Sequence, residues 1–253
     1  MYSELVKFIE ANEVLVNTSA LIWFLFCWVG YTYFAKYQSR HKSCLASELH
    51  KYREQWMQRV VRRDFRVADA ALMGNLERHV SFMASTTILI LAGLLTVLAV
   101  ADQIVGLITE IPFVASANTL SVQLKLLMLT AIFVYAFFTF TWSLRQYGFC
   151  SILLGSAPTL EEDISAGERD RYAFYAARVI DLAGTSYNHG LRAYYFALSV
   201  LVWFLNPLLF VVACTFVLAV LYRREFHSRS LWALRHQDHV DADGNPKEHP
   251  YNF

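Results

Sequence analysis

Charged residues are scarce in this sequence. They make up 17 % of the 253 residues, whereas about 25 % is usual for a soluble domain. Together with the hydrophobic content of 56 %, this shortage argues against a soluble globular chain and predicts a membrane protein. The first 13 residues also lack the basic segment of a cleaved signal peptide, because three glutamates accompany one lysine. We therefore expect the first hydrophobic segment to remain as an anchor.

Motifs of redox, metal and hydrolytic sites are missing as well. The four cysteines are isolated, with no C-x-x-C pair, which argues against a disulfide framework or a thiolate metal site. No G-x-S-x-G, H-E-x-x-H, Walker or G-x-G-x-x-G pattern occurs. We therefore expect no enzymatic activity, no cofactor, no bound metal and no nucleic-acid partner.

The longest uncharged stretch runs from Tyr194 to Tyr222. An unbroken helix over it would be about 43 Å long, more than the ~30 Å hydrocarbon core of a bilayer. Asn206 and Pro207 stand at its middle, and proline kinks a helix because it removes a backbone donor. If the chain turned back there, each half would have only about 15 residues, which is short for a crossing. We expect one kinked span.

Three other uncharged stretches predict further spans, at residues 14–34, 82–101 and 126–144. The sequence thus predicts an all-α integral membrane bundle with four transmembrane helices. We expect one membrane domain over residues 1–228, a polar tail over 229–253, and a short helix from Arg171 to Ala183. The partly apolar loop at 104–117 is expected at the membrane interface.

The connection after the first span is strongly basic. It holds ten Lys and Arg between Lys36 and Arg78, and no Gly or Pro occurs between Gly30 and Gly74, so a long basic helix is expected. Apolar residues recur on one face of it; they are Leu45, Leu49, Tyr52, Trp56 and Val60. The helix could lie on an anionic leaflet or pack on the protein's own cytoplasmic side. The surface reading would use Trp56, Arg59, Arg62 and Arg63.

Orientation follows from the distribution of Lys and Arg. In a four-span chain, the connections 36–81 and 145–192 hold fifteen of them and the other face holds seven. The positive-inside rule then places both connections in the cytoplasm and both termini outside, in a bacterial inner membrane. The arginines after the last span look cytoplasmic by themselves, and a turn at Asn206 would bring them inside.

Three segments resemble the family catalogued as domain of unknown function 599. They are Val67 to Leu95, Asn188 to Phe210 and Leu221 to Ser228. The resemblance implies about four membrane helices and an unassigned function. It supplies no catalytic residues.

A similar set of residues stands before the second span and before the fourth. The two sets are Asn75, Arg78 and His79, and Asn188, His189 and Arg192. If the two helix faces met, the arginines could bind an anionic ligand or lipid headgroup. The favoured alternative is that these residues close a helix bundle by ion pairs and reach the headgroups. Haem or metal ligation by His79 and His189 has little support, because neither belongs to a ligand motif.

The leading functional hypothesis is a non-enzymatic, homo-oligomeric scaffold or a lipid- or partner-binding module in the bilayer, with anionic lipid headgroups among its ligands. The alternative is a homo-oligomeric anion channel or transporter. Its path would include Arg78, Arg192 and the break at Asn206 and Pro207.

Overall fold

The computed structural model describes residues 13–38, 44–101, 103 and 119–236, and every regular element within these residues is a helix. The predicted all-α class is confirmed. Four stretches are long and apolar enough to cross a membrane: Val14–Ala35, Val67–Ala99, Thr119–Gly155 and Pro207–Arg235. The expected interface loop at 104–117 and the tail beyond 236 lie outside the described residues.

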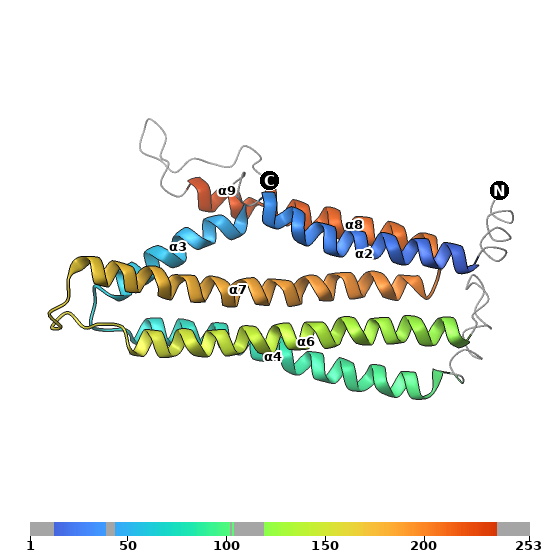
Figure 1. The fold of residues 1–253 in the computed structure, drawn as a ribbon, viewed down its shortest axis with the longest axis horizontal. Coiled ribbons are helices and arrows are strands. Elements are labelled where there is room, and N and C mark those ends of the chain that lie inside the picture. Colours follow the sequence, from blue (N-terminus) through green and yellow to red (C-terminus); the bar gives the residue numbers. More distant parts are fainter. Residues whose placement is uncertain (1–12, 39–43, 102, 104–118, 237–253) are drawn as a thin grey trace.

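Three long helices form the body of the molecule (Figure 1). They are α4 (Val67–Ala99), α6 (Thr119–Gly155) and α7 (Ala166–Trp203), with 33, 37 and 38 residues. At 1.5 Å per residue they are about 50 to 57 Å long, well beyond the ~30 Å hydrocarbon core of a bilayer. The predicted span at 126–144 is therefore part of the longer helix α6, and the predicted span at 82–101 overlaps the last part of α4, which begins 15 residues earlier and ends at Ala99.

Shorter helices divide this body into two halves. Two of them, α2 (Glu13–Gln38) and α8 (Pro207–Phe226), lie side by side along one half of α7, while α3 (Leu45–Val60) packs along the other half (Figure 1). We call these the membrane half and the α3 half. In the membrane half, α6 lies between α4 and α7.

The chain turns back at Asn206, and this differs from the expected single kinked span over 194–222. One helix, α7, ends at Trp203 and α8 begins at Pro207. The side chain of Asn206 caps α8 by accepting from the backbone N–H of Leu208 at 2.7 Å, and proline is favoured in the first turn because no donor is needed there. The two helices pack as an antiparallel hairpin, with the Trp203 and Phe210 rings stacked at 4.7 Å.

The core around α7 is closely packed. Small residues on α7 allow the neighbouring helices to approach, and Gly190 lies directly against the Phe140 ring of α6. Phe24 of α2 contacts both Phe196 of α7 and Phe210 of α8, with ring centroids 5.8 and 5.6 Å apart. These contacts fix α2 to the hairpin through aromatic packing.

The long basic helix expected after the first span is broken into shorter elements. Residues up to Gln38 belong to α2, and α3 begins after Cys44, whose side chain and Ser47 form a reciprocal cap. The chain leaves helical geometry again before α4. There the Arg66 guanidinium donates to the carbonyls of Ala157 and Pro158, at 2.6 Å each. The chain is therefore non-helical between α3 and α4, although no Gly or Pro is present there.

Two other boundaries also differ from the prediction. Helix α7 starts at Ala166 rather than Arg171, because Ser165 and Glu168 form a capping box. The backbone and hydroxyl of Ser165 both donate to the carboxylate, which lowers the pKa of Glu168. At the other end of the chain, Arg229–His236 forms the short helix α9 in place of the first part of the expected polar tail.

Candidate functional site

The first predicted set of polar residues lies on the exposed face of α4. Asn75, Arg78 and His79 are all exposed. The Arg78 guanidinium donates to the side chain of Asn75, one turn away on the same helix. This contact is the local pair that i, i+3 spacing favours.

The second predicted set lies on α7. Asn188 is exposed, while His189 and Arg192 are half-buried. The Arg192 guanidinium lies over the Tyr31 ring of α2, 5.3 Å from its centroid, a cation–π contact. The two arginines of the predicted cluster therefore have partners on different helices.

Helix α3 turns its apolar stripe toward the protein, as in the second of the two alternatives. Trp56 and Val60 pack with the main core. Trp56 and Arg63 both donate to the carboxylate of Asp69 on α4, which is 1 % exposed. Arg62 pairs with Asp170 at 2.9 Å on the surface, and Arg59 is exposed.

A second carboxylate fastens α3 to α7. Asp181 pairs with His50, and its other oxygen accepts from Arg53 at 2.8 Å. The Arg53 guanidinium fits over Gly184, where an added Cβ would be 3.0 Å from it. The sequence analysis did not predict that Asp69 and Asp181 would bind side chains of the segment after the first span.

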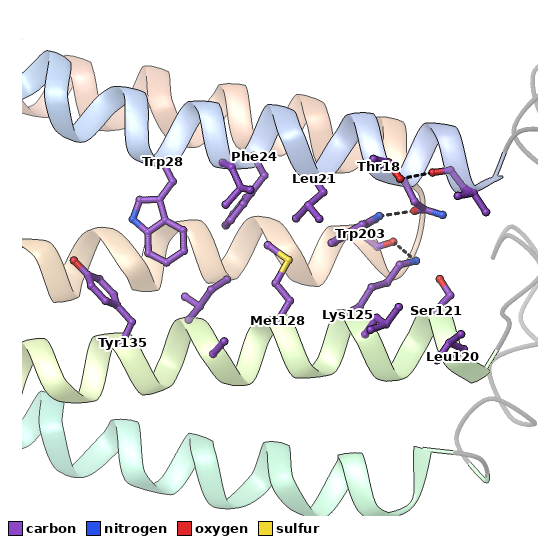
Figure 2. Close-up of a pocket in the computed structure, with 16 residues that line it drawn as sticks. Thr18, Leu21, Phe24, Trp28, Leu120, Ser121, Lys125, Met128, Tyr135 and Trp203 are labelled. Carbon is purple, nitrogen blue, oxygen red and sulfur yellow. Dashed lines mark hydrogen bonds between the residues drawn. The ribbon is translucent and has the colours of Figure 1, made fainter.

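A groove between α2 and α6 in the membrane half could hold a ligand (Figure 2). Its volume is about 700 Å³, and Trp203 of α7 contributes to its wall. Sixteen described residues line it: Val14, Asn17, Thr18, Leu21, Phe24, Leu25, Trp28, Leu120, Ser121, Leu124, Lys125, Met128, Ala131, Ile132, Tyr135 and Trp203. Most of this lining is aliphatic or aromatic.

Polar groups gather at the end of the groove where α7 ends. The Trp203 indole donates to Asn17 Oδ1 at 2.8 Å, and Lys125 Nζ donates to the Trp203 carbonyl at 3.3 Å. The same ammonium lies 5.4 Å from the centroid of the Trp203 ring. Figure 2 shows Ser121 and Thr18 beside these residues. The cation suits this place, since the C-terminal end of a helix carries partial negative charge.

The opposite end of the groove is lined by aromatic rings. Trp28 and Tyr135 meet edge to face there, with centroids 5.6 Å apart, and Figure 2 shows Met128 midway along. From Leu120 to Tyr135 the groove follows α6 for about 22 Å at 1.5 Å per residue. A site with a polar end and a long apolar body can hold an amphiphilic molecule.

Sequence reasoning missed this groove. Lys125 directly precedes the span predicted at 126–144, and Asn17 lies within the span predicted at 14–34. A polar residue inside an uncharged stretch, such as Asn17, and a lysine at the start of another, such as Lys125, could have indicated a binding site in the membrane. Within the described part of the chain, no three His, Cys, Asp or Glu side chains are grouped as metal ligands.

A family model described as "Protein of unknown function, DUF599" matches residues 19–230. The chain belongs to this family. The predicted resemblance is thereby confirmed, and the matched region contains nearly all of the described helices. No curated protein and no solved structure matches the chain.

Proposed function

We propose that this DUF599 protein is a non-enzymatic membrane protein that binds a lipid-like amphiphile in the groove between α2 and α6. The observation that carries the proposal is the groove itself. Its volume of about 700 Å³ lies within the ~300 to 1,000 Å³ of typical ligand sites. The two helices that form its sides, α2 and α6, contain stretches apolar enough to cross a membrane.

The surroundings of the groove favour a ligand from the bilayer. The membrane half exposes many large apolar side chains, including Ile22 and Phe26 on α2 and Leu124, which lines the groove. Lipid chains are the natural solvent of such a surface. A molecule that enters from the bilayer moves its apolar part from one apolar environment to another, so this part adds little to the selectivity of binding. We therefore expect the polar end of the groove to determine which molecules bind.

The anion channel is a weaker candidate on present contacts. It requires Arg78, Arg192 and Asn206 on a common path. Arg78 contacts Asn75, Arg192 lies over Tyr31, and Asn206 caps α8. Each residue thus has a local structural role. We therefore favour lipid binding over the anion channel.

Native mass spectrometry of the protein purified from membranes tests the proposal. Ala131 lines the groove, so Ala131→Trp should fill it and reduce the bound lipid at least tenfold. Val134 is on the same helix, is 39 % exposed and does not line the groove, so Val134→Trp is the matched control. Equal lipid binding by both variants would refute the proposal.

A further inference from the structure

We propose that, in the α3 half, the face shared by α6 and α7 binds a helix of a partner protein whose apolar stripe is flanked by acidic residues. This open face consists of Phe149 and Leu153 of α6 and of Tyr175, Val179 and Leu182 of α7. It is separate from the lipid groove. Three features support this assignment: the open face continues the surface on which α2 packs, it is apolar and exposed, and its edges are cationic.

The open face continues the side of α6 that lies under α2. Two residues of this side, Met128 and Tyr135, line the lipid groove, and the Tyr135 ring contacts Trp28 of α2. Seven residues make close to two helical turns, so residues at steps of seven share one side of a helix. The next two steps from Tyr135 reach Trp142 and Phe149, which are 51 and 41 % exposed.

The same relationship holds on α7, which lies beside α6 in both halves (Figure 1). The Phe196 ring of α7 stacks on Trp28 of α2. Two and three steps of seven residues lead back from Phe196 to Leu182 and Tyr175, which are 47 and 62 % exposed. Helix α2 ends at Gln38. The surface that seats α2 in the membrane half therefore extends past this helix, and its side chains there are exposed.

The side chains of the open face lie outside the hydrocarbon core. The helices α6 and α7 are about 25 Å longer than this core, and the α3 half carries the surface ion pair between Arg62 and Asp170. Large apolar side chains that gather on a surface facing water mark an interaction site. Aromatic residues and arginine, which are common on the open face and its edges, are also the residues most enriched at protein interfaces.

The size of the open face suits one helix. The segment from Arg171 to Leu182 covers about 16 Å of α7, or three helical turns. At the far end lies a groove of about 530 Å³, whose apolar lining includes Leu153, Tyr175 and Val179. A groove of this kind can hold an anchoring side chain of a partner. A helix that docks in this way presents its anchors at i, i+3 or i+4, and i+7.

The charges at the edges of the open face indicate the chemistry of the partner. Arg178 lies one helical turn from both Tyr175 and Leu182. Arg145 lies one turn from Phe149, with its guanidinium 5.8 Å from the centroid of that ring. Neither arginine has an ion-pair partner among the described residues. Carboxylates beside the apolar stripe of a partner helix would supply these partners.

The far end of the open face carries both signs of charge. Glu162 and Glu168 line the groove there together with Arg171. Each glutamate accepts from a backbone N–H of its own segment, of Thr159 and Ser165 respectively. These carboxylates thus have local structural roles, and the two arginines nearer the membrane half determine the charge that a partner meets.

A second copy of this chain fits the open face less well than a single helix does. Two copies in one bilayer are commonly related by a two-fold axis. Helix α2 stands on the same surface in the membrane half, so the α2 helices of the two copies would meet first. They would hold the two open faces apart.

Peptide binding to the full-length protein in nanodiscs of a zwitterionic lipid tests the proposal. The probes are two synthetic helical peptides with the same leucine stripe, one with glutamates beside the stripe and one with lysines. We expect one equivalent of the glutamate peptide to bind at least tenfold more tightly than the lysine peptide, and empty nanodiscs to bind neither. The double variant Arg145→Glu, Arg178→Glu should reverse this order, which a loss of folding would not do.

Alanine variants locate the binding site. The double variant Tyr175→Ala, Leu182→Ala should weaken binding of the glutamate peptide at least tenfold. Leu72 lies on α4 and is 53 % exposed, so Leu72→Ala is the matched control and should have no effect.

The outcomes that would overturn the proposal are distinct. If the two peptides bind equally well, the assigned charge of the partner is wrong. If the double alanine variant binds the glutamate peptide as the wild type does, the open face is not the site. The four native cysteines can be replaced, and Leu182→Cys can be added to that background. If this variant forms a disulfide-linked dimer in membranes and the wild type binds neither peptide, a second copy occupies the face.

Discussion

The indole nitrogen of Trp56 donates to Asp69 Oδ1 across 2.6 Å, joining α3 to the first turn of α4. The Arg63 guanidinium donates to the same oxygen. Asp69 is 1 % exposed, so both donors depend on a carboxylate that water scarcely reaches. This cluster is one of the polar connections between the basic segment and the long helices, together with the contacts of Asp181 with His50 and Arg53.

We expect Asp69→Ala to destabilise the protein by on the order of 2 to 4 kcal/mol, because it leaves the Trp56 and Arg63 donors without their acceptor. Thermal unfolding in nanodiscs, followed by tryptophan fluorescence, measures the change. Asp170→Ala removes the surface pair with Arg62, whose side chains are 63 % and 49 % exposed, and should cost less than about 1 kcal/mol. An equal loss in both variants would contradict the assigned role of Asp69.

We expect a larger residue at Gly190 to destabilise the protein. A Cβ at this position would lie 2.5 Å from Cε1 of Phe140, whose ring is fully buried. Gly190→Ala should therefore cost about 1 to 3 kcal/mol through overpacking, seen as a lower unfolding temperature. Phe140→Leu should relieve part of this loss in the double variant.

Gly148 provides the matched control for this substitution. It is in the helix α6, and an added Cβ would meet nothing within 4 Å. Gly148→Ala should stabilise the helix slightly, by up to about 1 kcal/mol. If Gly190→Ala behaved in the same way, the close approach to Phe140 would be refuted.

The hairpin at Asn206 predicts on which side each segment lies. The α8 end contacts α3 through Glu225, which accepts from Ala46 N–H at 3.2 Å, and Tyr52 donates to the Leu234 carbonyl at 2.9 Å. Residues 55 and 230 should therefore share one side of the membrane, with residue 119 on the other. A single kinked span would instead separate 55 from 230.

Cysteine labelling measures this arrangement. The four native cysteines are buried and can be replaced to give a cysteine-free background. In sealed vesicles, a membrane-impermeant maleimide should label Gln55→Cys and Ser230→Cys together, and Thr119→Cys only from the opposite side. Permeabilised vesicles should label all three. Labelling of Ser230→Cys with Thr119→Cys would contradict the hairpin.

Much of the helical framework could be predicted because it depends on composition. The uncharged stretches at 14–34 and 126–144 each lie within a helix apolar enough to cross a membrane, and the stretch at 82–101 coincides with such a helix up to Ala99, since a segment in hydrocarbon must satisfy its own backbone hydrogen bonds. The turn at Asn206 was not predicted. An asparagine before a proline fits both a kink and a new helix start, and packing of α8 along α7 decides between them.

The candidate site was less predictable than the framework. A groove exists where two helices are held apart, and that separation depends on how α2 and α6 each pack against other helices. No local pattern around Asn17 or Lys125 encodes it. The same reason applies to Asp69 and Asp181, which are separated from Trp56 and Arg53 along the chain but adjacent to them in space.

The continuity of α4, α6 and α7 from the membrane half into the α3 half has a mechanical consequence. Transmembrane helices adjust their tilt to the thickness of the bilayer. These three helices pass without a break from one half to the other, and α4 and α6 are apolar enough to cross a membrane. A change in the tilt of the membrane half is therefore expected to move the α3 half with it.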